Sequence, residues 1–96
     1  MSDYTVTHRP ASSRGEFHLE QGARRLGYLD YSIAGDVMRI HYVEVDPSLR
    51  GAGLGRRLID AAVACARDEG MRIVPICGYA RTVLSRDPEF ADVLKS

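Results

Sequence analysis

Hydrophobic and polar residues alternate along the first half of the chain, which predicts a series of β-strands. The predicted strands cover residues 4–8, 16–20, 25–33 and 37–45. Turn sequences separate the last three strands, at Gln21-Gly22 and at Ala34-Gly35-Asp36, so neighbouring strands are expected to run antiparallel. The first half of the chain therefore predicts an antiparallel meander, with residues 4–8 as a short edge strand.

The alternation breaks once within the third predicted strand. Leu26 and Tyr28 lie in one phase, and Tyr31 and Ile33 lie in the other, with the slip near Asp30. A β-bulge near Asp30 would return the apolar side chains to a single face. We therefore expect Tyr28 and Tyr31 to share the face that packs against the core.

The hydrophobic period changes to that of a helix after Pro47, because proline cannot donate to a strand ladder and ends the preceding strand. A helix is predicted over residues 53–69, with Gly70 in the place of a left-handed C-cap. Its apolar stripe consists of Leu54, Leu58, Ala62 and Cys65. Residues 71–77 predict a short buried strand, and a strand–helix–strand unit requires a parallel crossover. Two short helices are predicted over residues 79–85 and 88–94.

These elements predict one small α+β domain that spans residues 1–96. Its sheet is mixed and mostly antiparallel, with one parallel β-α-β crossover after the glycine-rich loop. A chain of 96 residues that is 45% hydrophobic suits a single domain. Thirteen basic and thirteen acidic residues give a formal net charge of zero, which argues against a nucleic-acid-binding protein.

Targeting and metal-binding signals are not found in the sequence. The chain start has no signal-peptide core, and the longest apolar run, residues 61–66, is too short to cross a bilayer. Two cysteines do not make a disulfide framework, and the three histidines lack the spacing of metal ligands. We therefore expect a cytoplasmic protein with no bound metal and no membrane partner, while its oligomeric state stays open.

The loop before the long helix carries three glycines at alternate positions, Gly51, Gly53 and Gly55, flanked by Arg50 and Arg56. Glycines leave backbone N–H groups uncovered at a helix start, where the first four N–H groups have no partner within the helix. The positive end of the helix dipole favours a pyrophosphate there, and arginines add charge-assisted hydrogen bonds. A Rossmann fingerprint needs glycine where Arg56 stands, and the Gly-Lys-Ser/Thr of a P-loop is absent. The alternative is that these glycines only permit a tight helix entry.

The segment Arg50-x-x-Gly53-x-Gly55, after Val45-x-Pro47, resembles the acyl-CoA-binding signature of the GCN5-related N-acetyltransferases (GNAT). The chain is similar to the minimal YjdJ-type branch, which shares patterns like Glu44-Val45, Ile73-Val74-Pro75-Ile76-Cys77 and Pro88-Glu89-Phe90. That branch usually has histidines where this chain has Tyr42 and Asp87.

The resemblance implies a GNAT-like fold and acetyl-CoA as the cosubstrate. In the family, loop amides bind the pyrophosphate, and the preceding strand pairs with the pantetheine arm. The cofactor-binding residues that it implies here are Val43, Val45, Arg50, Gly51, Ala52, Gly53, Leu54, Gly55 and Arg56.

Acetyl transfer requires a neutral amine, so a general base is expected. Glu44, at the end of the central strand, is the first candidate, although it could equally hold Arg50 or Arg56 in place. His41 is the second candidate, but strand alternation places it on the face opposite Glu44 unless a bulge intervenes. Cys77 could protonate the leaving thiolate, act as a nucleophile or simply pack in the core, and Tyr79 is a weaker candidate for the acid.

The sequence therefore predicts an N-acetyltransferase-like protein that transfers an acetyl group from acetyl-CoA to an amine of a small molecule, peptide or protein. A non-catalytic CoA- or acyl-CoA-binding module is the alternative. A third interpretation is a small interaction domain whose glycine loop only packs.

Overall fold

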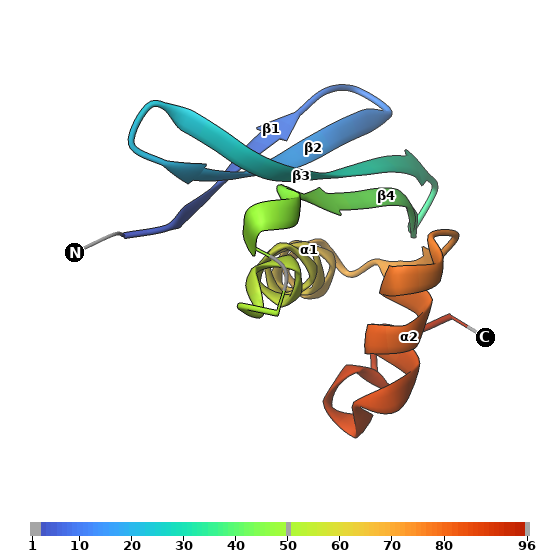
Figure 1. The fold of residues 1–96 in the computed structure, drawn as a ribbon. Helices are drawn as coiled ribbons and strands as arrows, with labels where there is room; N and C mark the ends of the chain where they lie inside the picture. The colour runs from blue at the N-terminus through green and yellow to red at the C-terminus, as the bar shows by residue number, and fades with distance from the viewer. Residues whose placement is uncertain (1–2, 50, 96) are drawn as a thin grey trace.

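A computed structural model of the chain describes residues 3–49 and 51–95 (Figure 1). Its strands are β1 (Thr5–Pro10), β2 (Arg14–Gln21), β3 (Arg24–Ala34), β4 (Val37–Val45) and β5 (Arg72–Pro75). Its α-helices are α1 (Leu54–Glu69) and α2 (Gly78–Arg86), and two 3-10 helices follow β4 and α2, namely η1 (Pro47–Leu49) and η2 (Pro88–Phe90). In the described part of the chain, no helix is both long enough and apolar enough to cross a membrane.

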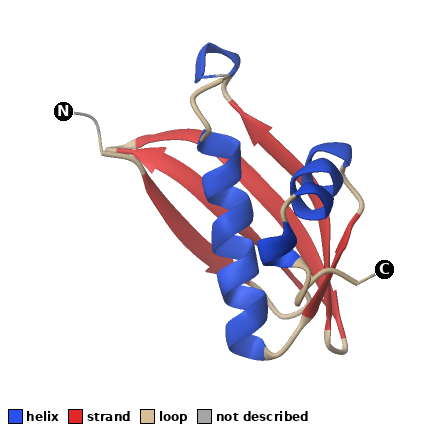
Figure 2. Cartoon of the chain, turned by 90° about the horizontal axis from the view of Figure 1, so that it is seen from below, coloured by secondary structure: helices blue, strands red, loops and turns tan. Residues whose placement is uncertain are grey.

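The five strands form one sheet in the order β1-β2-β3-β4-β5. The first three pairs are antiparallel, and β4 and β5 are parallel. Both helices lie on one side of the sheet (Figures 1 and 2), and we call that side the inner face and the opposite side the outer face. The predicted α+β fold, with its antiparallel meander and single parallel crossover, is confirmed.

The core lies between the inner face and α1. Leu19, Leu29, Met38 and Ile40 of the sheet are buried completely, as is Leu58 of the helix. Six residues of α1 are buried, which are Leu54, Leu58, Ile59, Ala62, Val63 and Ala66. The predicted apolar stripe therefore fixes which face of α1 meets the sheet. The helix ends at Gly70, which is left-handed (φ 68°) and donates to the last carbonyl groups, as predicted.

A β-bulge lies where β3 and β4 pair, as the sequence indicates near Asp30. Ile40 lies opposite Tyr31 and Tyr42 lies opposite Asp30, so the extra residue is His41 of β4. In such a bulge the extra residue, His41, and the next residue, Tyr42, point to the same side of the sheet as Asp30, which lies opposite them. His41 accordingly meets Ser32 of the outer face, at 2.7 Å from the hydroxyl oxygen.

The bulge bears on two expectations from the sequence. Because the extra residue belongs to β4, β3 keeps its alternation across this bulge, and Leu29 and Tyr31 face the core. A second register shift, where β3 pairs with β2, leaves Leu26 of β3 as an extra residue that is also buried. Tyr28 instead lies on the outer face, directly opposite Glu44, so the expectation that it shares the core face is wrong. The sequence places His41 and Glu44 on opposite faces unless a bulge intervenes, and this bulge does intervene and places both on the outer face.

The C-terminal segment differs from the predicted helix over residues 88–94. Only η2 is helical, started by the Asp87 carboxylate, which accepts from the Glu89 N–H at 3.0 Å. The chain then runs beside β5, where Leu94 forms a parallel bridge with Ile73. Hydrogen bonds to the edge of β5 therefore replace those of a helix. Local periodicity could not predict this, because the bonded residues lie far apart in the sequence.

Gly27 lets β3 and β4 approach each other beside the end of β4. A Cβ at this position would lie 2.6 Å from the Glu44 carbonyl oxygen and 3.2 Å from the Val45 Cα. Backbone atoms cannot rotate away, so we expect Gly27→Ala to destabilise the fold by about 1–3 kcal/mol in urea unfolding. Gly78→Ala is the matched control, because the space around Gly78 is open. This variant should be more stable to unfolding than the unaltered protein by about 0.4–1 kcal/mol. Equal effects of the two substitutions would contradict this prediction.

Candidate functional site

The parallel strands β4 and β5 separate halfway along β4. They pair from Val37 opposite Arg72 to Ile40 opposite Pro75, and then diverge (Figure 2). The Ile40 carbonyl oxygen accepts from two N–H groups at this point, those of Ile76 (2.9 Å) and Cys77 (3.1 Å). Beyond it, the described pairing leaves the β5 side of β4 uncovered.

The uncovered edge of β4 presents backbone groups of two valines. The Asp46 N–H donates to the Leu26 carbonyl at 2.8 Å. Because antiparallel residues alternate between bonding and non-bonding pairs, the N–H and C=O groups of Val43 and Val45 point away from β3. An extended ligand that carries amide groups can add to such an edge as a further strand.

The glycine-rich loop ends beside this edge and starts α1. Gly51 (φ 85°) and Gly53 (φ 75°) are left-handed, a conformation that favours glycine. Gly53 is the N-cap residue of α1, no side chain caps the helix, and the first turn carries no acidic residue. Among the described residues, the first-turn N–H groups thus have no side-chain acceptor, which suits an anion. The Ala52 N–H differs because it donates to the Leu49 carbonyl at 3.2 Å.

A cavity of about 610 Å³ joins the strand edge to the helix start. It is lined by Val43, Glu44, Val45, Leu49, Gly51, Gly53, Leu54, Gly55 and Tyr79. Six of the predicted cofactor-binding residues line it, whereas Ala52 and Arg56 do not, and Arg50 lies outside the described residues. The arrangement combines an apolar wall, an open strand edge and a helix N-terminus, and it fits a ligand with an extended arm and an anionic group.

The Arg56 side chain is bound elsewhere. Its guanidinium donates to Asp60 at 3.1 Å and to Asp87 at 2.9 Å, and it lies 4.7 Å from the centre of the Phe90 ring. These hydrogen bonds raise the pKa of Arg56, while the Glu89 N–H and then Arg56 lower the pKa of Asp87. The side chain therefore ties α1 to η2, and it does not belong to the cavity lining described above.

Tyr79 reaches the cavity from the first turn of α2. A Cβ on Gly55 would lie 2.8 Å from the Tyr79 hydroxyl oxygen, so this close approach requires glycine at position 55. Burial is the main cause that raises the pKa of Tyr79 above its ordinary value of 10.0. The phenol is therefore protonated at neutral pH and can donate a proton. The sequence ranks Tyr79 below Cys77, and only the position of α2 against α1 shows that it lines the cavity.

The three predicted catalytic residues occupy different places. Glu44 lies at the cavity and beside Tyr28, whose pKa is raised by burial and then by this carboxylate. His41 lies on the outer face three residues earlier. Cys77 is the N-cap residue of α2, is half-buried and packs against the core, and it does not belong to the cavity lining described above. The structure thus brings Glu44 and Tyr79 to one cavity.

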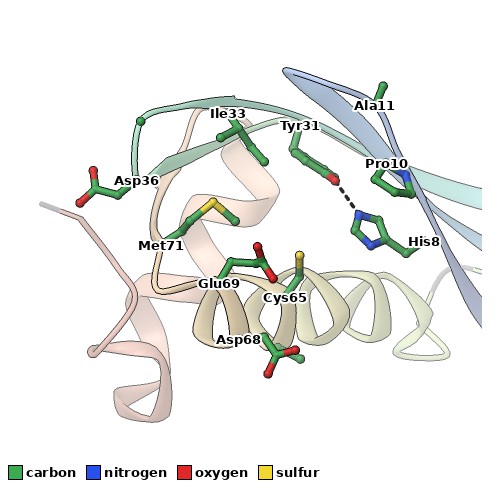
Figure 3. Close-up of a pocket in the computed structure, with 12 residues that line it drawn as sticks. His8, Pro10, Ala11, Tyr31, Ile33, Asp36, Cys65, Asp68, Glu69 and Met71 are labelled. Atoms are coloured by element: carbon green, nitrogen blue, oxygen red, sulfur yellow. Dashed lines mark hydrogen bonds between the residues drawn. The ribbon is translucent and has the colours of Figure 1, made fainter.

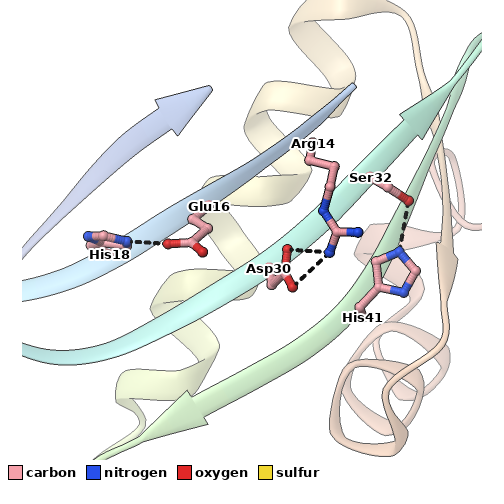
Figure 4. A network of polar contacts seen from close by, with 6 residues as sticks. All are labelled: Arg14, Glu16, His18, Asp30, Ser32 and His41. Carbon is pink, nitrogen blue, oxygen red and sulfur yellow. Dashed lines mark hydrogen bonds and ion pairs between the residues drawn. The ribbon is translucent and has the colours of Figure 1, made fainter. Parts of the chain in front are cut away.

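Most charged groups of the outer face near the centre of the sheet are already paired (Figure 4). Arg14 donates to Asp30 at 3.1 Å, and the Glu16 carboxylate lies 2.6 Å from the His18 ring nitrogen. Asp30 lies directly opposite Tyr42 in the ladder. A cation that approached Asp30 would therefore meet Arg14 first.

A second cavity, of about 770 Å³, lies at the other end of α1 (Figure 3). His8 and Tyr31 form a hydrogen bond within it, and Cys65, which the sequence places in the helix stripe, also lines it. Three carboxylates lie around it, those of Asp36, Asp68 and Glu69. Their negative charge disfavours an anion, so the cavity at the start of α1 is the candidate site for an anionic ligand. In the described ranges, no three metal-ligating side chains come together.

A family model described as GCN5-related N-acetyl-transferase matches residues 14–93 of this chain. A search of curated protein sequences gave no match.

Solved structures agree with this match in fold. A GCN5-like protein from Staphylococcus aureus superposes with a TM-score of 0.74 at 22% identity, over 94% of this chain and 88% of that one. The ribosomal-protein-S18-alanine N-acetyltransferase from Escherichia coli superposes with a TM-score of 0.66 at 20% identity, over 80% of this chain and 52% of that one. A GNAT-family structure from Desulfovibrio desulfuricans superposes with a TM-score of 0.65 at 19% identity, over 77% of this chain and 54% of that one. The chain thus spans about half the length of the latter two proteins. Since the family model covers most of the sequence, the chain belongs to the GCN5-related N-acetyltransferase family.

Proposed function

We propose that this protein binds acetyl-CoA in the cavity at the start of α1 and transfers the acetyl group to an amine. The observation that carries the proposal is the meeting, in one cavity, of an uncapped helix N-terminus and the open edge of β4. An acyl-CoA has both matching parts, because its pyrophosphate is an anion and its pantetheine arm carries two amides. Membership of the family supports the same assignment.

Binding would rest mainly on backbone groups. The N–H groups from Gly53 to Arg56 would donate to the pyrophosphate, where the helix dipole favours negative charge. The arm would run along Val43 and Val45 as an added strand. We assign Arg50 a charge-assisted contact with the pyrophosphate, on the strength of its position in the sequence motif alone.

Acetyl-CoA supplies an activated acyl group, and the chain supplies the proton transfers. A protonated alkylamine with a pKa of about 10.4 costs roughly 4–5 kcal/mol to deprotonate at pH 7. Glu44 would accept this proton, directly or through water, as the amine nitrogen attacks the thioester carbon. The carbon–sulfur bond then breaks, and Tyr79 would give its proton to the departing thiolate. We prefer Tyr79 to Cys77 as the acid because Tyr79 lines the cavity, and His41 stays the second candidate for the base.

Substitution of Glu44 tests the catalytic part of the proposal. We expect Glu44→Gln to lower kcat for amine acetylation by about a hundredfold, because a positioned base contributes at least that much. The Kd for acetyl-CoA should change less than about twofold, because the amide is similar in size and the binding groups are backbone atoms. Acetylated product is measured by mass spectrometry, and Glu16→Gln on the same face of the sheet is the control. If acetyl-CoA binds but no amine is acetylated by the unaltered protein, the non-catalytic CoA-binding module is the correct interpretation.

A further inference from the structure

Three large hydrophobic side chains are exposed in the described chain, and they belong to the second half of β4 or to the segment just after β5. They are Tyr42 (62% exposed), Ile76 (48%) and Tyr79 (44%). Tyr42 precedes Glu44 by two residues on the same face of β4. Exposed apolar groups that cluster beside a polar group are typical of a ligand site rather than of ordinary surface.

Tyr42 and Ile76 border the divergence of β4 and β5 on its outer side. The Ile76 N–H donates to the Ile40 carbonyl at 2.9 Å, and Tyr42 lies two residues after Ile40. With a rise of about 3.3 Å per residue, the two side chains start within roughly 10 Å of each other. Ile76 directly follows the end of β5 at Pro75, and its side chain is exposed there, as that of Tyr42 is on β4. An apolar group can therefore lie between them while its amine reaches Glu44.

The charges around this patch disfavour a second cation. Asp30, opposite Tyr42, is held by Arg14 at 3.1 Å. Arg39 adds an exposed guanidinium earlier on the same strand. Among the described residues, Glu44 has no ion-pair partner and can attract one ammonium group. Arg14 and Arg39 on the same face would repel the second charge of a dication.

We infer that the acceptor is a primary amine with one positive charge on an apolar or aromatic body, and that Tyr42 and Ile76 determine this specificity. Polyamines and basic peptides are poor acceptors on this account. The inference rests on the proposed acetyl transfer and adds the chemical class of its acceptor.

Two amines of equal length test the inference. Hexylamine and 1,6-diaminohexane differ only by a terminal ammonium group, and 2-phenylethylamine provides an aromatic body. With acetyl-CoA and the full chain, we expect kcat/KM for hexylamine and 2-phenylethylamine to exceed that for the diamine by about tenfold or more. Equal or better use of the diamine overturns the inference and leaves the acetyltransferase proposal intact. If none of the three amines is acetylated although acetyl-CoA binds, the proposed catalysis fails and the inference fails with it.

Variants assign the preference to named residues. Tyr42→Ser and Ile76→Ser should each raise KM for hexylamine several-fold and leave the Kd for acetyl-CoA unchanged. Each should also reduce the ratio of kcat/KM for hexylamine to kcat/KM for the diamine. Arg14→Gln frees Asp30 and should raise kcat/KM for the diamine. Arg9→Ser, at the far edge of the sheet, is the control and should change none of these values. An unchanged preference in both Tyr42→Ser and Ile76→Ser overturns the inference, as does a dimer that Tyr42→Ser converts to monomers without a change in selectivity.

Discussion

Gly53→Ala is expected to weaken acetyl-CoA binding by about ten- to a hundredfold. Gly53 is left-handed (φ 75°), and a Cβ at this position would meet no side chain or backbone from elsewhere in the described chain within 4 Å. Alanine therefore fits sterically but resists this conformation, at a cost of about 1–2 kcal/mol. Relief of that strain would turn the first-turn N–H groups away from the pyrophosphate, and each charge-assisted bond that is lost weakens binding by about 1.5–3 kcal/mol.

Gly70→Ala provides a matched control at the other end of the same helix. Gly70 has a similar left-handed backbone (φ 68°) and equally open surroundings. Both variants should lose a similar amount of unfolding free energy, but only Gly53→Ala should lose affinity in titration calorimetry. Equal Kd values for the two variants would show that the glycine loop does not bind acetyl-CoA.

The second large effect is expected for Tyr79→Phe. Removal of the phenolic proton should lower kcat by about a hundredfold, because the thiolate then leaves without an acid. Fold and Kd should be preserved, since the ring stays and only the hydroxyl group is lost. Stopped assays that quantify the acetylated amine measure the change, and Thr82→Val on α2 is a control that also removes a hydroxyl group.

The pH dependence of Tyr79→Phe gives an independent check. Burial raises the pKa of Tyr79, so the acid form persists through neutral pH and is lost only above its ordinary value of 10.0. The unaltered protein should therefore become more active as the amine deprotonates, and then decline at the alkaline end. That alkaline decline should be missing from Tyr79→Phe, and a decline in both proteins would assign it to another group.

Local patterns were sufficient to predict the elements that carry the site. The strand over residues 37–45, the helix stripe and the Gly70 cap all follow from features within a few residues of one another. The parallel pairing of β4 with β5 follows from the order of the elements. These features position the glycine loop beside the end of β4.

Contacts between distant residues could not be predicted in this way. The extra residue of the bulge lies in β4, whereas the break in the pattern lies in β3, so the sequence does not show that His41 shares a face with Glu44. The pairing of Arg56 with Asp87 joins residues 31 positions apart. The approach of Tyr79 to Gly55 likewise depends on how α2 packs against α1. Each of these contacts changes the role that the residue type alone would suggest.

The most direct test of the acetyl-CoA site is a titration followed through backbone amide resonances of the ¹⁵N-labelled protein. We expect acetyl-CoA to shift the amide resonances of Gly51, Gly53, Gly55 and Arg56, together with those of Val43 and Val45. Amides that line the second cavity, such as those of Cys65 and Glu69, should not move. No shift at millimolar acetyl-CoA, or shifts confined to the second cavity, would contradict the assignment of this loop as the acyl-CoA site.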